Sequence, residues 1–274
     1  MKILIAHDGA VSLDVVVDDM RRAGLPADAR SFVVCVTGAD SPQKGTRLKA
    51  AMALTDAACD RIQAQFPHWA LSSDTLPGPP ADVILKTSQW WRPDLLVIGS
   101  DAFAHERTRT TSVPLELVHR ARCSVRVARP PLSGPAGPIR LVIGNNGSKA
   151  CEAVIREVAR RQWPENTQAH VLTVVAPASS QDEPHRAIDA AADAAEDEYV
   201  DCLRAAGVTA DRRFIHGDPR QELVRESESS NADTIFVGPR CFPSASRFLL
   251  GSVATAVVTR ARSTVEVVRS RSGP

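Results

Sequence analysis

The chain has 274 residues, with 33 basic and 32 acidic side chains and a formal net charge of +1. Hydrophobic residues make up 43% of the chain, which is ordinary for a globular protein, and the length suits two domains. The balanced charge argues against nucleic-acid binding as the main activity, because such binding rests on a basic surface.

Targeting signals and metal motifs are not apparent in the sequence. No stretch approaches the roughly 18 apolar residues that span a membrane, and the opening apolar run is too short for a signal peptide. We therefore expect a cytoplasmic protein. The six cysteines are scattered without any CxxC spacing, which predicts free thiols and no metal ligands.

Short apolar runs alternate with longer amphipathic stretches along the chain. We expect strands in the first half at residues 3–6, 32–36, 70–76, 95–98 and 125–128, and in the second half at 141–143, 170–175, 210–215, 234–237 and 265–268. Alanine-rich stretches at 43–65 and 184–206 carry charges at helical spacing and predict helices. Several strands are continuously apolar, which is typical of parallel strands covered on both faces.

The second half repeats the first at a shift of 138 to 140 residues. Residues 94–99 align with 233–238, and residues 119–127 align with 259–267, sharing an Arg-Ala-Arg triplet. Between the copies, residues 129–138 contain four prolines and two glycines, which predicts a linker. We expect domains at 1–129 and 139–270, joined by 130–138. Each is expected to be a doubly wound, mostly parallel five-stranded α/β sheet of Rossmann-like type.

Two motifs carry a family resemblance. The first strand runs into His7-Asp8-Gly9-Ala10, and the second copy has Asn145-Asn146-Gly147-Ser148 at that place. Later, Gly238 is followed by two residues, then Cys241, nine residues and Gly251-Ser252. This pattern resembles the nucleotide loop of universal stress proteins, in which a second glycine stands at the position of Cys241. The resemblance covers essentially the whole chain.

The resemblance implies a fold like that of adenine nucleotide alpha hydrolases, and a site for ATP or a related adenine nucleotide, with or without Mg²⁺. In that family an acid at the position of Asn146 contacts the ribose, and a valine late in the second strand meets the adenine through its backbone. Carried onto the second half, the implied site consists of Asn146, Val174, Gly238, Arg240, Cys241, Gly251, Ser252 and Val253. In the first half the matching residues are Asp8, Val36, Gly99 and Ser112.

The loop also makes physical sense as a phosphate site. Glycines allow backbone N–H groups to approach phosphate oxygens, and Gly251-Ser252 opens a helix expected over 253–261, whose start favours anions. A serine there would also cap the helix without any ligand.

The two halves depart from the family pattern differently. The first keeps Asp8 but has Ala102 and Thr111 in place of loop glycines, with Asp101 adding negative charge. The second keeps most of the loop but has Asn146 instead of an acid. Because the loop supplies several N–H donors to charged oxygens, we expect the second half to hold the nucleotide site.

Three other features have structural explanations. Residues 78–80 and 217–219 predict turns into a helix with proline in its first turn. His216 beside Asp218 suggests acid–base chemistry, but no nucleophile or metal ligand accompanies them. Trp90-Trp91 ends a helix and predicts core or interface packing.

The final strand of each copy is expected at a sheet edge. Universal stress proteins commonly pair through this strand, so the resemblance implies an intramolecular pseudo-dimer, and it leaves a further homodimer open. The sequence thus favours a non-enzymatic stress-response protein that binds an adenine nucleotide. The alternatives are an interaction protein that has lost nucleotide binding and a weak ATPase, which would need a metal-positioning acid.

Overall fold

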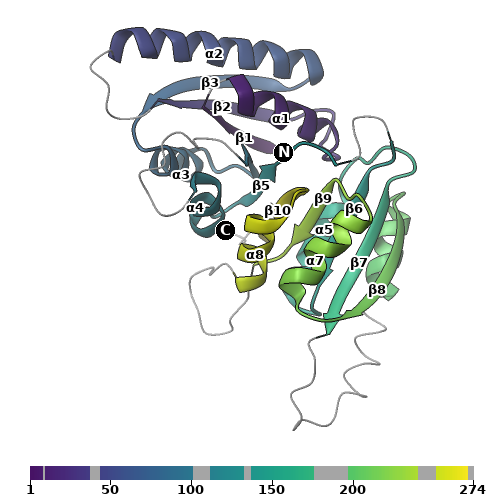
Figure 1. Ribbon diagram of the computed structural model, residues 1–274. Coiled ribbons are helices and arrows are strands. Elements are labelled where there is room, and N and C mark those ends of the chain that lie inside the picture. Colours follow the sequence, from purple (N-terminus) through teal and green to yellow (C-terminus); the bar gives the residue numbers. More distant parts are fainter. Residues whose placement is uncertain are drawn as a thin grey trace. The chain divides into compact units, whose positions relative to one another are not determined.

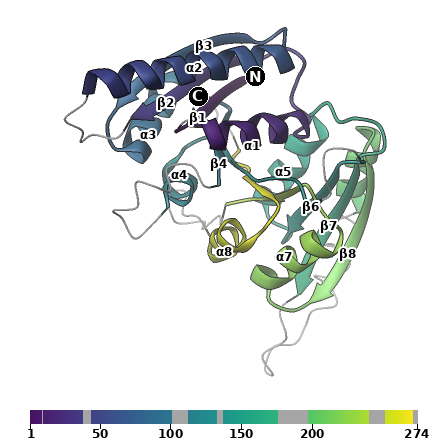
Figure 2. The same ribbon diagram turned by 45° about the horizontal axis from the view of Figure 1, so that its top comes forward.

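A computed structural model describes residues 1–8, 10–37, 44–100, 112–132, 137–175, 197–239 and 251–270. It contains two compact units, residues 1–130 and residues 131–270, which are described separately below (Figure 1, Figure 2).

The first unit is a parallel sheet with helices on both faces. Its strand order is β3-β2-β1-β4-β5, and every neighbouring pair is parallel. The elements are β1 (Lys2–His7), α1 (Ala10–Arg21), β2 (Arg30–Thr37), α2 (Lys44–Gln65), β3 (Ala70–Pro77), α3 (Pro80–Trp91), β4 (Leu95–Gly99), α4 (Val113–Arg120) and β5 (Ser124–Ala128).

The second unit repeats this topology. Its order is β8-β7-β6-β9-β10, again with parallel neighbours. The elements are β6 (Arg140–Asn145), α5 (Lys149–Ala159), β7 (Gln168–Val175), β8 (Thr209–His216), α7 (Pro219–Ser229), β9 (Thr234–Val237), α8 (Ser252–Arg260) and β10 (Thr264–Val267). Residues 197–205 are also helical; the rest of the helix expected over 184–206 lies mainly outside the described residues. The predicted fold, two tandem doubly wound sheets, is confirmed.

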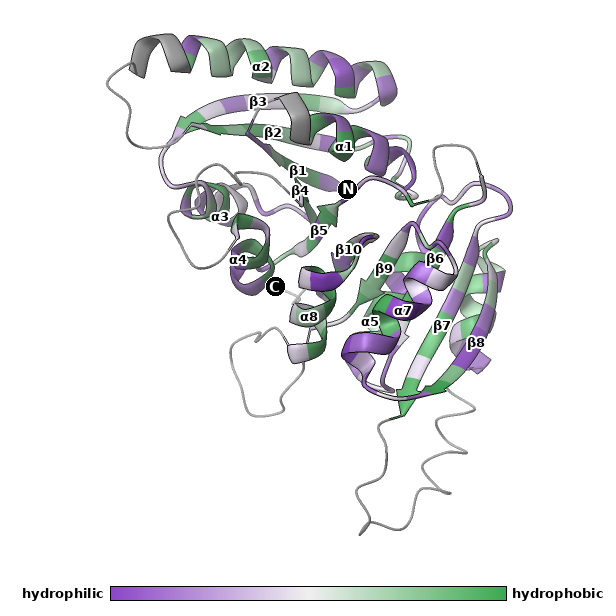
Figure 3. Ribbon diagram, viewed as in Figure 1, coloured by the Kyte–Doolittle hydropathy of each residue, from purple (hydrophilic) through white to green (hydrophobic). Residues whose placement is uncertain are grey.

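Each unit has its own apolar core. In the first, α1 and α2 pack residues such as Val16 and Ile62 onto inward-facing Ile3, Ile5 and Val97 of the sheet. In the second, α5 and residues 197–205 cover the equivalent face of β6, β7 and β9. Hydrophobic colour concentrates on inner strands such as β9 (Figure 3). These strands are buried on both faces, which explains their continuous apolar runs.

A hydrogen bond at the amino edge of the sheet confirms the register of the repeat. The Lys2 backbone N–H donates to Asp94 Oδ2 at 2.8 Å, and the Arg140 N–H donates to Asp233 Oδ2 at 2.8 Å. The aspartate before the fourth strand of each copy thus fixes the start of the first strand.

Both predicted turns into the third helix are confirmed, and each requires glycine. Gly78 has φ +136° and Gly217 has φ +155°, and a proline opens the helix that follows each of them. A Cβ on Gly217 would lie 2.8 Å from Glu222 Cγ. Asp218 is the N-cap of α7 and accepts a hydrogen bond from the Arg220 N–H at 2.9 Å. This capping role accounts for Asp218 without acid–base chemistry.

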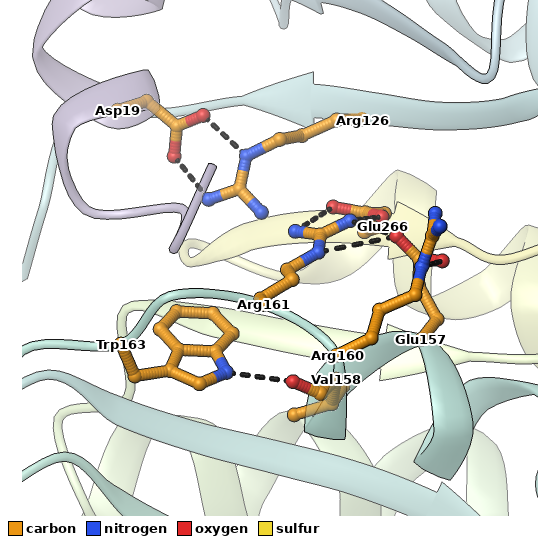
Figure 4. A network of polar contacts seen from close by, with 8 residues as sticks. All are labelled: Asp19, Arg126, Glu157, Val158, Arg160, Arg161, Trp163 and Glu266. Carbon is orange, nitrogen blue, oxygen red and sulfur yellow. Dashed lines mark hydrogen bonds and ion pairs between the residues drawn. The ribbon is translucent and has the colours of Figure 1, made fainter. Parts of the chain in front are cut away.

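The last strand of the first unit carries a buried charge. Arg126 is fully buried in β5 and binds Asp19 of α1 through both carboxylate oxygens, at 2.6 and 2.9 Å (Figure 4). Such bidentate geometry is favourable for an arginine–carboxylate pair.

In the second unit the equivalent strand position has the opposite charge. Glu266 of β10 is fully buried, and Arg161, just after α5, donates hydrogen bonds to both its oxygens (Figure 4). Arg161 also binds Glu157, the residue that corresponds to Asp19. The repeat therefore keeps an acid on the helix, reverses the charge on the strand, and places an arginine between them.

Candidate functional site

The site predicted for the second half lies where the strand order changes direction. β6 is the first strand of its copy and β9 the fourth, and they are neighbours in the sheet although the helices after them cover opposite faces. In open α/β sheets ligands bind beyond the carboxyl ends of such strands. Asn146 follows β6 and Gly238 follows β9, so the topology brings these two predicted residues to one edge.

Gly238 lies against the start of α5. A Cβ at this position would be 3.0 Å from Ala150 Cβ and 3.3 Å from the Ala150 carbonyl atoms. Any larger residue would push the end of β9 away from the helix. The glycine therefore has a packing reason as well as the predicted phosphate-binding one.

Asn146 caps α5. Its Oδ1 accepts a hydrogen bond from the Ser148 N–H at 3.2 Å and lies 2.9 Å from the Cys151 Sγ. The Asn146 N–H in turn donates to that sulfur at 3.3 Å. Because a backbone N–H points at Oδ1, the amide orientation is fixed and Nδ2 is left as a donor. Within the described part of the chain Nδ2 has no hydrogen-bond partner.

The preceding residue completes this turn. Asn145 Oδ1 accepts from the Gly147 N–H at 3.0 Å, and its Nδ2 donates to Thr173 Oγ1 of β7 at 3.0 Å. Gly147 has φ +69°, a conformation that suits glycine. Asn145, Cys151 and Thr173 were not predicted as site residues. Asparagine side chains commonly bond the backbone two residues further on, so the asparagine pair before a glycine is the turn signal that could have indicated Asn145.

Gly251, and not Ser252, is the N-cap of α8. The helix runs over Ser252–Arg260, so its expected start at residue 253 is one residue late and the expected serine cap is wrong. The glycine takes an extended conformation with φ −70° and ψ 157°, and the Thr255 N–H donates to its carbonyl at 3.0 Å. Ser252 therefore occupies the first helical position, where its exposed hydroxyl makes no hydrogen bond to the described residues. Val253 follows it, half-buried.

Val174 lies at an open end of β7. The β6–β7 pairing stops at Asn145 and Thr173, whereas the β7–β8 pairing continues through Val174 and Val175. The β6–β7 ladder therefore ends beside Val174, on the side of the switch point. Arg240 and Cys241 lie outside the described residues.

The first unit places its matching residues in the same way. Asp8 follows β1, Gly99 ends β4, and Ser112 is the N-cap of α4, although its side chain makes no capping bond. Val36 is buried near the end of β2. Burial raises the pKa of the nearby Cys35 thiol, and the charge of Asp8 acts in the same direction, against a hydrogen bond with Thr55 that lowers it. The loop at 101–111 lies outside the described residues.

Neither metal clusters nor membrane spans occur in the described ranges. No group of three histidine, cysteine or acidic side chains there could hold a metal ion. No helix in them is long and apolar enough to cross a membrane. Cys35, Cys59, Cys123, Cys151 and Cys202 form no disulfide among the described residues.

Comparison with known proteins identifies the family. The profile of the Universal stress protein family matches residues 1–129 and again residues 140–269. The chain therefore belongs to the universal stress protein family and contains two of its domains, which confirms the resemblance inferred from the motifs.

Solved structures agree on the fold. A universal stress protein from Archaeoglobus fulgidus DSM 4304 is 17% identical, with a TM-score of 0.70, over 98% of this chain and 96% of its own. A protein from Pseudomonas aeruginosa UCBPP-PA14, described as a candidate universal stress protein, is 14% identical, with a TM-score of 0.65, over 97% and 92%. No curated protein matches the chain.

Proposed function

We propose that this chain is a non-enzymatic stress-response protein of the cytoplasm that binds ATP or a related adenine nucleotide in its second half. Membership of the family supports the ligand class. The assignment rests on the topology of the second sheet. Gly238, the start of α8 and the end of β7 all belong to the carboxyl edge of this sheet, at its switch point.

The phosphates would bind at the start of α8. The helix has nine residues, and its first N–H groups have no partner within the helix, which suits an anion. Ser252 adds a hydroxyl that is exposed and unused by the described residues. Arg240, Cys241 and Val253 remain proposed members of this loop.

The base and the ribose would bind toward β7 and β6. Main-chain groups at the end of β7, beside Val174, would meet the adenine, a contact that is almost independent of the side chain. Asn146 would contact the ribose as a donor through Nδ2, because its oxygen already accepts from Ser148. A ribose hydroxyl can accept such a bond as well as donate one.

A magnesium ion would depend mainly on the nucleotide. Since the described residues contain no cluster of metal-binding side chains, Mg²⁺ would be held by phosphate oxygens and water.

Gly251→Asp tests the site, and the first unit provides the matched control. Gly251 and Ser112 are both helix N-caps with nearly identical backbone angles. Aspartate is itself a favourable N-cap, so both Gly251→Asp and Ser112→Asp should keep their helices. We expect calorimetric titration with ATP–Mg²⁺ to give one site per chain, lost in Gly251→Asp and retained in Ser112→Asp. Loss in Ser112→Asp alone would assign the nucleotide to the first unit.

An interaction protein without nucleotide binding is the second candidate. Asn146 stands where the family pattern has an acid, and its Oδ1 already contacts the Ser148 N–H and the Cys151 Sγ. Because this oxygen is less available to a nucleotide than a carboxylate would be, the contacts favour the second candidate. A ligand that binds only the folded state raises the melting temperature. An unchanged melting temperature in millimolar ATP would therefore support this candidate over the first.

We further propose that the limits 1–129 and 139–270 bound the two domains, and that β5 and β10 pair with each other as a pseudo-dimer. Both strands have one sheet neighbour within their own unit, β4 or β9, which leaves an edge in each. Hydrogen exchange tests the pairing of β5 with β10. The β5 and β10 amides that do not bond to β4 or β9 should exchange slowly, and fast exchange at both edges would contradict the pairing.

A further inference from the structure

The first unit carries an aromatic and basic surface. It consists of Phe32, Trp90 and Trp91, with Arg30 and Arg92 beside them, and we call it the Trp90 patch. Arg30 begins β2, while the two tryptophans end α3 and Arg92 follows them. The patch is therefore built at the amino ends of the strands.

Trp90 is unusually exposed for a tryptophan that already has aromatic neighbours. Its side chain contacts Phe32 edge-on, with ring centroids 6.1 Å apart, yet 73% of the residue is accessible to solvent. Phe32 also contacts Trp91, at 5.8 Å. The aromatic cluster holds the Trp90 indole at the surface without covering it. Tryptophan is among the residues enriched at the energetic hot spots of protein interfaces.

The charge around the indole is positive and unpaired. Arg30 and Arg92 are exposed, and in the described part of the chain neither makes an ion pair. Lys2 lies beside them, with its Nζ 4.6 Å from the Trp91 ring centroid and hydrogen-bonded to the Trp91 carbonyl. Burial lowers the pKa of Lys2, and the charges of Arg30 and Arg92 lower it further, which places the three cations close together.

The fold does not require this surface. At the equivalent positions the second unit has Gln168 for Arg30, His170 for Phe32, Ser229 and Ser230 for the tryptophans, and Asn231 for Arg92. Arg92 and Asn231 share a left-handed conformation, with φ 51° and 50°. The same backbone is thus built without the two tryptophans, the phenylalanine and the two arginines, so the fold alone does not account for them.

We propose that the Trp90 patch binds an acidic segment of a partner protein, with an apolar side chain packed on Trp90 and carboxylates bound by Arg30 and Arg92. The planar guanidinium group suits bidentate carboxylate binding. A strand of nucleic acid fits less well, because it requires a row of cations along successive phosphates. Here the Lys2 amine is already engaged by Trp91, so among the described residues of the patch only Arg30 and Arg92 remain available to phosphates.

The second unit supplies substitutions that this backbone tolerates. Trp90→Ser and the double variant Arg30→Gln/Arg92→Asn introduce the residues found in the other copy. Arg61→Gln/Arg156→Gln is the control, since it removes two exposed arginines of other helices. Melting curves and ATP titrations of the full chain should be alike for all four proteins.

The experiment selects short random peptides displayed on phage against the immobilised full chain. We expect the enriched peptides to combine carboxylates with one large apolar residue. Their affinity should fall about tenfold or more in Trp90→Ser and in Arg30→Gln/Arg92→Asn, but not in the control. Replacing the carboxylates of these peptides by amides should lower their affinity for the wild type by a similar factor.

Four results would overturn the proposal. The first is a selection that yields no peptides able to distinguish the wild type from Trp90→Ser, and the second is enriched peptides without acidic residues. The third is labelled oligothymidylate that binds the wild type and loses affinity in both patch variants, which would indicate a nucleic-acid surface. The fourth is light scattering in which Trp90→Ser turns a dimer into a monomer, which would make a second copy of this chain the occupant.

Discussion

Removing Arg126 should destabilise the first unit severely. The side chains of Arg126 and Asp19 are 0% and 5% exposed, and two hydrogen bonds of 2.6 and 2.9 Å join them. Arg126→Met takes the guanidinium from a buried carboxylate, which costs about 3–5 kcal/mol. With a urea dependence of about 2 kcal/mol per molar, the unfolding midpoint should fall by roughly 2 M.

Tryptophan fluorescence during urea unfolding measures this effect. Three of the four tryptophans lie in the first unit, so a Trp163→Phe background makes the signal specific for it. The control is Arg61→Met, because Arg61 pairs with Asp14 while both side chains are about half exposed, and its loss should cost less than about 1 kcal/mol. Asp19→Leu/Arg126→Met removes both charges and should recover most of the stability. Equal effects of Arg126→Met and Arg61→Met would refute the reasoning.

Two further predictions concern thiols and acid stability. Cys202 is exposed, whereas burial raises the pKa of the Cys35 thiol. Iodoacetamide at neutral pH should therefore label Cys202 well before Cys35. Peptide mass mapping measures the order of labelling, and equal labelling rates would contradict the prediction. Hydrogen bonds from Arg220 lower the pKa of Asp218, so its stabilising effect is present above the usual aspartate range and is lost as the pH falls through the lowered pKa. The stability difference between wild type and Asp218→Ala should therefore shrink in acid, and a pH-independent difference would exclude this role.

Strands and topology could be predicted from the sequence because burial on both faces leaves continuous apolar runs. The runs located all ten strands, although Val268 was placed in the last strand and lies just after β10. Helix starts were less certain. Gly251 and Ser252 both suit a helix terminus, and the one-residue choice depends on the path of the preceding chain.

Side-chain partnerships could not be predicted. Arg126 lies between two valines, and an alternating pattern in a strand normally indicates a solvent-facing charge. Its burial depends on Asp19, 107 residues away, which no local pattern reveals. Similarly, Asn146 was predicted as a ribose contact from its position, but its oxygen is engaged by the Cys151 thiol and the Ser148 N–H. Which atom of a polar residue remains available is set by tertiary contacts.

The reversed charges of β5 and β10 restrict how the two copies could have diverged after duplication. Changing the strand arginine to glutamate in one step would have buried two carboxylates together, at a cost that few proteins survive. An arginine at the position of Arg161, where the first copy has Ala23, had to come first or at the same time. The exchange of Arg126 for Glu266 between the copies is therefore coupled to the exchange of Ala23 for Arg161.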